Sequence, residues 1–356
     1  MPSEAGVSPH RVRNSSEDCR AQGSRWPRFP PHVTLGRRLS GSVITGRYGA
    51  GVSAGESLDV TAWTVEQPEA GGGGQNRWLR DPEDRRWLYK ATRINRHNGQ
   101  PQGEDWAEKA VEGLASLIGV PTAHVEVAHV VRSDGVELGV ISRDLAVDMD
   151  LQGGFMLLAD VPGYRFRDER GRPPRDHVGH TVANVRRALQ EQRVRPPVGF
   201  APGSFTAFDV FAGFLLLDAW VGNQDRHEEN WAVLRSPDAE LSLAPSFDHG
   251  ASLGFLLSEE QRALKTSDGD AMRTFAQGGK ATKFEGRRLE LVEVAADALR
   301  QAGPEAQSYW YGQLERVDTE TCATVLASVP RLSEGSRNFC LQLLDINRRR
   351  LLDVCR

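Results

Sequence analysis

The sequence has few cysteines, no long hydrophobic run and no excess of basic residues, and each absence excludes a class of protein. Its 4 cysteines form no Cys-x-x-Cys pair and no cluster with the spacing of zinc ligands. The richest apolar stretch, 211–221, contains Asp218 and is shorter than the roughly 18 residues of a membrane span. Lysine plus arginine total 44 against 48 acidic residues, without the basic excess of most nucleic-acid binders. We therefore expect a cytoplasmic protein with reduced thiols, no membrane association and no direct nucleic-acid binding.

The first 55 residues also lack regular patterning. They are rich in Gly, Ser, Arg and Pro, and they contain no apolar core of a secretory signal. We expect residues 1–55 to be a disordered extension. Strands are predicted after this extension, at 58–65, 77–80 and 86–90. The glycine run Gly71–Gly74 separates the first two, and a turn at 81–84 separates the last two.

An amphipathic helix follows these strands. Apolar residues recur at intervals of three and four across 106–118, the spacing of one helix face. Two further strands, 123–131 and 136–141, read as a hairpin. The pattern therefore predicts a small β-rich lobe over residues 56–145.

From residue 146 the sequence is mainly helical. Segment 205–221 is apolar on nearly every side, which predicts a buried helix. Two short strands, 231–234 and 241–244, come after it. Other helices are predicted at 181–191, 289–299, 305–314, 319–326 and 337–354. The fold class is therefore α+β, with a small β-rich lobe followed by a larger, mostly helical one over 146–356.

The stretch that carries the most chemical information is Asn-Gln-Asp-Arg-His-Glu-Glu-Asn at 223–230. It lies between the buried helix and a short strand, so a rigid element can position a loop that presents side chains to a ligand. Asp248 follows the second strand of the pair, and the ends of a short hairpin lie close together. Asn230 and Asp248 are therefore expected to be neighbours that supply two oxygen ligands for Mg²⁺. Asp225 is left to accept the proton of an attacking hydroxyl, a role that phosphoryl transfer requires.

This pattern resembles a known family. Asp-x-His-x-x-Asn, followed by a hairpin and a second aspartate, is similar to the catalytic loop and metal-binding aspartate of HipA-like protein kinases. Leu-Ala-Pro-Ser-Phe-Asp-His-Gly at 243–250 is also typical of that group. The resemblance runs from about Leu58 to the C-terminus and is most specific over 218–254. It implies a bilobal protein-kinase-like fold that binds ATP and Mg²⁺ between its lobes and phosphorylates Ser or Thr of a protein substrate.

The resemblance implies roles for the catalytic loop. Asp225 would be the catalytic base or the carboxylate that orients the hydroxyl. His227 belongs to the same catalytic loop, where shaping the loop by hydrogen bonding is favoured over proton exchange. Asn230 and Asp248 would hold Mg²⁺.

The resemblance also implies a nucleotide-binding set in the first lobe. Lys90 would contact the α- and β-phosphates of ATP, and Glu108 on the following helix would be its ion-pair partner. Gly72, Gly73 and Gly74 would bring backbone N–H groups near the phosphates. A run of four glycines is equally typical of a flexible linker, so both interpretations of the run stay open.

Some features depart from the family pattern or leave alternatives. Glu104 and Glu112 lie one helical turn on either side of Glu108 and are rivals for the pairing with Lys90. The second aspartate is followed by His249-Gly250 rather than Phe-Gly. Little of the chain remains for the additional N-terminal subdomain of the founding toxin, so we do not expect contact with an antitoxin of that type.

Two other functions remain compatible with the same residues. Phosphoinositide kinases use a comparable Asp-Arg-His-x-x-Asn, which makes a lipid or small-molecule kinase an alternative. A pseudokinase that binds nucleotide as a regulatory module is another, although the presence of Lys90, Asp225, Asn230 and Asp248 argues against it.

Overall fold

A computed structural model describes residues 57–68, 76–95, 99–167, 176–286 and 289–354. The predicted disordered extension at 1–55 lies outside these residues. So do Gly72, Gly73 and Gly74, whose role at the phosphates stays a prediction.

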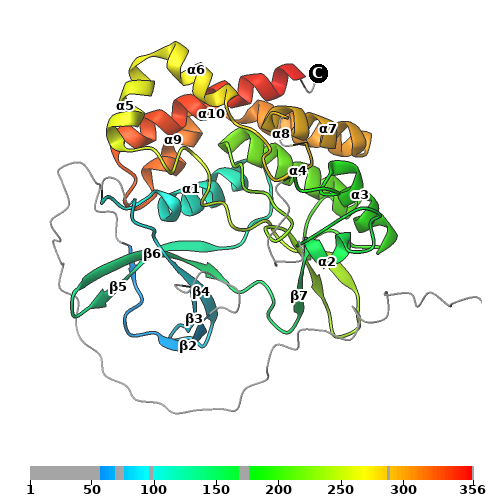
Figure 1. The fold of residues 1–356 in the computed structure, drawn as a ribbon, viewed down its shortest axis with the longest axis horizontal. Coiled ribbons are helices and arrows are strands. Elements are labelled where there is room, and N and C mark those ends of the chain that lie inside the picture. Colours follow the sequence, from blue (N-terminus) through cyan, green and yellow to red (C-terminus); the bar gives the residue numbers. More distant parts are fainter. Residues whose placement is uncertain (1–56, 69–75, 96–98, 168–175, 287–288, 355–356) are drawn as a thin grey trace, which may run out of the picture. The chain divides into compact units, whose positions relative to one another are not determined.

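The first part of the described chain forms a six-stranded sheet in the order β1-β5-β6-β4-β3-β2 (Figure 1). Its strands are β1 (Leu58–Asp59), β2 (Thr64–Pro68), β3 (Arg77–Arg80), β4 (Arg86–Ala91), β5 (Val125–Arg132) and β6 (Gly135–Arg143). Strand β1 runs parallel to β5, and the other neighbouring strands are antiparallel. The sheet thus contains the predicted strands at 77–80 and 86–90 and the predicted hairpin.

The prediction of a single strand over 58–65 is wrong. The chain turns between β1 and β2, because the Asp59 carboxylate accepts hydrogen bonds from the backbone N–H and the hydroxyl of Thr61. The N–H of Trp63 then donates to the carbonyl of Val60 at 3.1 Å. This local turn sends β2 to the far edge of the sheet, beside β3.

Helix α1 (Glu104–Leu117) connects the sheet to the helical part of the protein. It packs against β5 and β6 on one side and against α9 (Thr319–Ala327) on another. Its buried residues, among them Trp106, Val111 and Leu114, belong to the same hydrophobic cluster as the later helices. The sheet has a smaller cluster of its own around Trp87 and Tyr89. Helix α1 is therefore fixed by the larger core, not only by the sheet.

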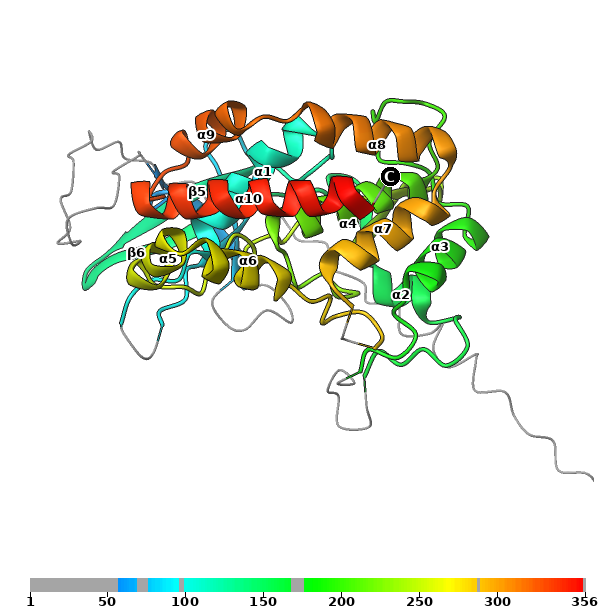
Figure 2. The same ribbon diagram turned by 90° about the horizontal axis from the view of Figure 1, so that it is seen from above.

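The second part of the chain is mainly helical. Its helices are α2 (Gly154–Leu158), α3 (Val182–Glu191), α4 (Ala207–Val221), α5 (Glu259–Ser267), α6 (Gly269–Gln277), α7 (Leu291–Gln301), α8 (Pro304–Arg316), α9 (Thr319–Ala327) and α10 (Glu334–Val354). A second sheet has the order β7-β8-β9, formed by β7 (Asp150–Gly153), β8 (Ala232–Arg235) and β9 (Leu241–Leu243). Helix α10 packs against α4, α5, α7 and α9 (Figure 2).

Helix α4 is the centre of this part. All of its residues are buried, as its apolar character on every side predicts. Thr206 and Asp209 form a capping box at its start, each side chain accepting a backbone N–H of the other. It ends at Gly222, whose φ of 72° lies in the left-handed region that favours glycine. The chain leaves this rigid helix directly into the loop that sequence patterning singles out.

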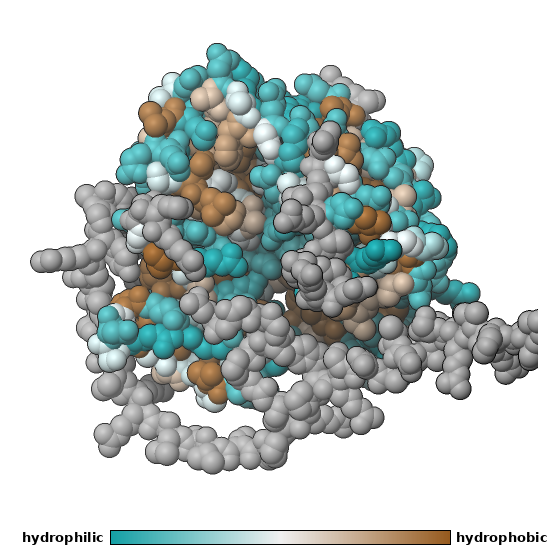
Figure 3. Space-filling model, in the orientation of Figure 1, coloured by the Kyte–Doolittle hydropathy of each residue, from teal (hydrophilic) through white to brown (hydrophobic). Residues whose placement is uncertain are grey.

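Hydrophilic residues predominate among the coloured residues of the face shown in Figure 3. Within the described chain, none of the helices has both the length and the apolar character that crossing a bilayer requires. Cys322 and Cys340 are free and buried, and burial raises the pKa of the two thiols to about 11 and about 12. Both are therefore unreactive core residues.

Candidate active site

The candidate catalytic loop, 223–230, begins with a set of hydrogen bonds to α4. Asn223 donates its backbone N–H to the Asp218 carbonyl and its side-chain Nδ2 to Asp218 Oδ1, both at 2.8 Å. The Asn223 amide oxygen in turn accepts the backbone N–H of Asp225 at 3.1 Å. The first turn of the loop is thus fixed to the end of a buried helix.

A buried arginine holds the middle of the loop. Arg226 donates from Nε and Nη2 to the two oxygens of Asp218, each at 2.7 Å. It also donates to the Asn230 carbonyl at 2.6 Å and to Ser246 Oγ at 3.0 Å. The side chains of Arg226 and Asp218 are only 3% and 2% exposed. Asp218, a buried polar residue of a mostly apolar helix, therefore anchors the loop, and Arg226 has a structural role that the sequence did not indicate.

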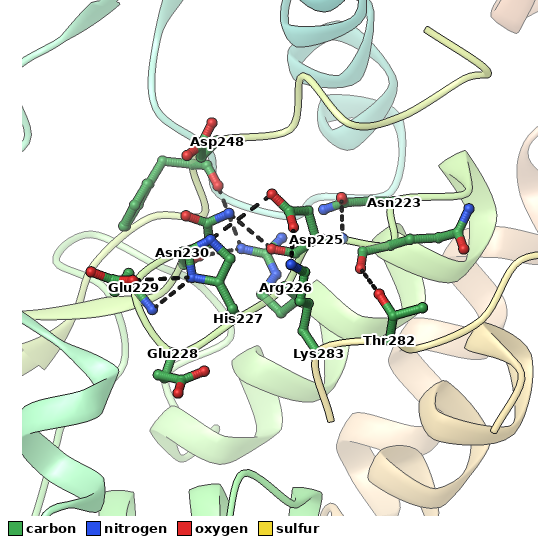
Figure 4. Close-up of polar contacts among 12 residues, drawn as sticks. Asn223, Asp225, Arg226, His227, Glu228, Glu229, Asn230, Asp248, Thr282 and Lys283 are labelled. Atoms are coloured by element: carbon green, nitrogen blue, oxygen red, sulfur yellow. Dashed lines mark hydrogen bonds and ion pairs between the residues drawn. The ribbon is translucent and has the colours of Figure 1, made fainter. Parts of the chain in front are cut away.

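The loop leaves Asp225 accessible. Its side chain is 38% exposed, and Oδ1 lies 3.0 Å from Nζ of Lys283 (Figure 4). His227 Nε2 lies 3.9 Å from Asp225 Oδ2, while its Nδ1 accepts the backbone N–H of Glu229 at 3.2 Å. His227 thus bonds within the loop, and Asp225 is the carboxylate presented at its surface.

Asn230 and Asp248 lie near the two open ends of the β8–β9 hairpin, one before β8 and the other after β9. Arg226 Nη1 contacts the carbonyl of Asn230 and, at 3.5 Å, that of Phe247, so the two ends of the hairpin share one side chain (Figure 4). Asn230 Nδ2 donates to the Asp225 carbonyl at 2.8 Å, which leaves its amide oxygen as the atom for a metal. Asp248 has a φ of 62°, a left-handed conformation uncommon outside glycine and typical of functional positions.

Lys90 reaches this place from the first sheet. It lies on β4, and its Nζ is 2.8 Å from Asp248 Oδ1 and 3.7 Å from Glu108 Oε1. The other oxygen of Glu108 accepts the backbone N–H of His249 at 2.9 Å. One lysine and two carboxylates, from a strand, a helix and a loop far apart in the sequence, are therefore in contact.

The neighbours of Glu108 on α1 have other partners. Glu104 pairs with Arg93 at 3.2 Å, and Glu112 pairs with Lys109 at 2.8 Å. Of the three glutamates that sequence patterning leaves open, the structure places Glu108 beside Lys90.

The pKa values of the two carboxylates around Lys90 are shifted in opposite directions. Burial raises the pKa of Glu108 above its ordinary value, and this effect outweighs the attraction of the Lys90 ammonium. Desolvation also favours the neutral form of Asp248, but the Lys90 ammonium and its hydrogen bond, together with His227 and His249, outweigh it and lower the pKa of Asp248. The negative charge of the cluster is therefore concentrated on Asp248.

The residues fit a magnesium ion that is bound together with a nucleotide. The ionised Asp248 carboxylate and the Asn230 amide oxygen are two hard oxygen donors, as Mg²⁺ prefers when phosphates complete its coordination. In the described ranges, no group of three His, Cys, Asp or Glu side chains is placed to hold a metal by itself. The donor set therefore suits a metal–nucleotide complex better than a permanent metal site.

Lys283 is a site residue that sequence patterning missed. It lies between α6 and α7, in a segment that reads Gly-Gly-Lys-Ala-Thr-Lys at 278–283. Glycines followed by lysines are common in solvated loops, so this composition gives only a weak signal. Its contact with Asp225 depends on tertiary packing.

No protein-family model matches the sequence, and none of the curated proteins does. Among solved structures, the Helicobacter pylori proinflammatory kinase CtkA is similar with a TM-score of 0.62 and 16% identity, over 84% of this chain and 97% of the other. HipA of Shewanella oneidensis MR-1, solved with HipB and operator DNA, gives a TM-score of 0.47 and 15% identity, over 82% and 65% of the two chains. The Golgi casein kinase gives 0.39 and 12%, over 83% and 74%. The first of these similarities confirms the predicted protein-kinase-like fold.

Proposed function

We propose that this protein is a HipA-like kinase that uses ATP and Mg²⁺ to phosphorylate a serine or threonine hydroxyl of a protein substrate. The observation that carries the proposal is the ion pair between Lys90 and Asp248. It joins the sheet lysine to the hairpin whose other end holds Asn230, beside the accessible carboxylate of Asp225. These are the groups that phosphoryl transfer needs, namely a phosphate-binding cation, oxygen ligands for a metal, and a base.

The nucleotide side of the site supplies charge and position. Lys90 would contact the α- and β-phosphates, and Glu108 would hold the lysine in place from α1. Asn230 and Asp248 would bind Mg²⁺, which supplies charge neutralisation at the phosphates when bound. Since Lys90 and Asp248 lie 2.8 Å apart, the phosphates and the metal that they would hold are placed next to each other.

The acceptor side of the site supplies the base. Asp225 accepts the proton of the attacking hydroxyl, and the backbone bonds of Asn223 and Asn230 fix the position of Asp225. The loop therefore presents the Asp225 carboxylate at a defined place.

The test is a pair of isosteric substitutions, Asp225→Asn and Asp248→Asn. Each should abolish phosphotransfer to protein. Phosphotransfer is measured by mass spectrometry of phosphosites after incubation of the protein with ATP, Mg²⁺ and host lysate. Each should leave the melting temperature nearly unchanged, because both side chains are partly exposed. Full activity in either variant would overturn the assigned roles. A panel of lipid and small-molecule acceptors, run with the same ATP, separates the alternative kinase class.

A further inference from the structure

The segment that carries Lys283 is docked on Gln224 of the loop by one backbone and one side-chain hydrogen bond. The N–H of Lys280 donates to Gln224 Oε1 at 3.1 Å, and the hydroxyl of Thr282 donates to the Gln224 carbonyl at 3.1 Å. Gln224 directly precedes Asp225 in the loop. The segment and the catalytic carboxylate are therefore held in one local unit.

The other side of the segment is bonded to His180. The His180 ring donates from Nδ1 to the Lys283 carbonyl at 2.6 Å, and the N–H of Glu285 donates to the His180 carbonyl at 2.9 Å. His180 is fully buried and stacks on Phe284 with 4.4 Å between ring centroids. The backbone of Lys283 is thus fixed whatever its side chain does.

The two lysines of the segment have different partners. Lys280 extends to Glu290, with 3.0 Å between the charged atoms, whereas Lys283 extends to Asp225 at the same distance. The side chain of Lys283 is 32% exposed, and its ammonium contacts the Asp225 carboxylate (Figure 4). No other lysine or arginine of the described chain is within ion-pair distance of Asp225.

We propose that Lys283 is a catalytic residue of the phosphoryl transfer, an inference that rests on the proposed kinase function. Its ammonium holds the Asp225 carboxylate in the resting site and contacts the γ-phosphoryl oxygens during transfer. A fixed cation at the point where the transferring group carries its charge stabilises the transition state more than the ground state. Lys90 and Lys283 then flank the phosphates from two sides, one from the sheet and one from the helical part.

The chemical step balances without a further reactant. The acceptor oxygen forms a bond to the γ-phosphorus as the bond from that phosphorus to the β,γ-bridging oxygen breaks. The hydroxyl proton passes to Asp225, and the electron pair of the broken bond leaves on ADP. Lys283 keeps its proton throughout, so it can serve both the base and the phosphoryl group.

The first experiment compares Lys283→Met with Lys280→Met. Lys283→Met should lower kcat by about 10²–10³-fold, the usual effect of removing one transition-state donor, with Mg²⁺–ATP affinity and melting temperature close to those of the wild type. Lys280→Met, three residues away in the same segment, should retain wild-type kcat because its ammonium bonds Glu290. The backbone contacts that dock the segment are kept in both variants.

The second experiment restores the ammonium. Lys283→Cys, alkylated with 2-bromoethylamine, carries an amine on a side chain of nearly the length of lysine, and kcat should recover. Wild-type protein treated in the same way controls for alkylation of the native cysteines. Wild-type kcat in Lys283→Met, with Asp225→Asn inactive, would overturn the inference and leave the proposed function standing. An inactive Lys283→Met whose Cys counterpart gains nothing on alkylation would also overturn it. Absence of turnover by the wild type would instead remove the proposed function.

Discussion

The catalytic loop and the cluster around Lys90 form one site, but they are held by different interactions. In the loop, a charge pair is almost completely removed from water, since the side chains of Arg226 and Asp218 are 3% and 2% exposed. In the cluster, Lys90 and Asp248 are 24% and 40% exposed and form a direct pair. A buried pair is rigid and hard to exchange, whereas a partly exposed pair can be replaced by other ligands.

The difference corresponds to two tasks. The loop must present Asp225 in one geometry, and a buried, multiply bonded guanidinium achieves this without any ligand. In the proposed function, Lys90 and Asp248 would each take up a new partner when a nucleotide and a metal bind. We therefore expect substitutions in the Arg226–Asp218 pair to destabilise the protein. Substitution of Lys90 should instead weaken ligand binding with little effect on stability.

The largest expected effect is that of Arg226→Met. It leaves the Asp218 carboxylate buried without its partner, which should lower the free energy of unfolding by about 3–5 kcal/mol in urea denaturation. Arg349→Met, which breaks an exposed pair with Asp345 on α10, is the matched control. It should change the free energy of unfolding by less than about 0.5 kcal/mol.

A second variant keeps this prediction testable if Arg226→Met does not fold. Combining it with Asp218→Asn removes the uncompensated charge and should recover part of the lost stability. Equal stability of the single variant and the wild type would show that the loop is not held by this pair.

An intermediate effect on the free energy of unfolding is expected from acid, because the buried His180 lies beside the loop and contacts Trp231 and the Lys283 carbonyl. Its Nδ1–H donates to the Lys283 carbonyl and its Nε2 accepts the indole N–H of Trp231, so both nitrogens fit the neutral ring. Burial lowers the pKa of His180 from 6.5 to about 4, although the Glu228 carboxylate, 3.8 Å away, favours the charged form. The unfolded chain therefore binds a proton first as the pH falls.

The sign of the pH dependence follows from that order. The stability that neutral His180 contributes is complete above pH 6.5 and is lost as the pH falls towards about 4, by up to about 3 kcal/mol. The gap in unfolding free energy between wild type and His180→Gln should narrow over that range, because glutamine does not titrate. Parallel curves for the two proteins would contradict the assignment.

The same comparison explains which parts of the site the sequence predicts. Asp225, Asn230 and Asp248 lie on one loop and the hairpin after it, so their spacing encodes their proximity. Lys90 and Glu108 come from other elements, and the resemblance to a kinase family was needed to connect them with the loop. Lys283 has neither signal, since only the packing of its segment on Gln224 and His180 brings it to Asp225.

The missed elements of the fold have similar causes. Helix α5 buries only Arg262, so it lacks the apolar face by which a helix is found in a sequence. Strand β7, Asp-Leu-Gln-Gly, has no strand-forming composition and exists because β8 offers it an edge. In contrast, α4 is apolar throughout, and its position was predicted within two residues of the observed start.

The smallest expected change in stability is that of Lys90→Met. The pair that it breaks is partly exposed, and Glu108 can lose its charge because burial has already raised its pKa, so the unfolding free energy should change by about 1 kcal/mol or less. Mg²⁺–ATP affinity by calorimetry should fall about ten- to a hundredfold, the loss of one hydrogen bond to a charged group. Lys109→Met, on α1 and paired with Glu112, is the control and should bind as the wild type does. Unchanged affinity in Lys90→Met would remove Lys90 from the nucleotide site, and a large loss of stability would show that the Lys90 cluster is as rigid as the loop.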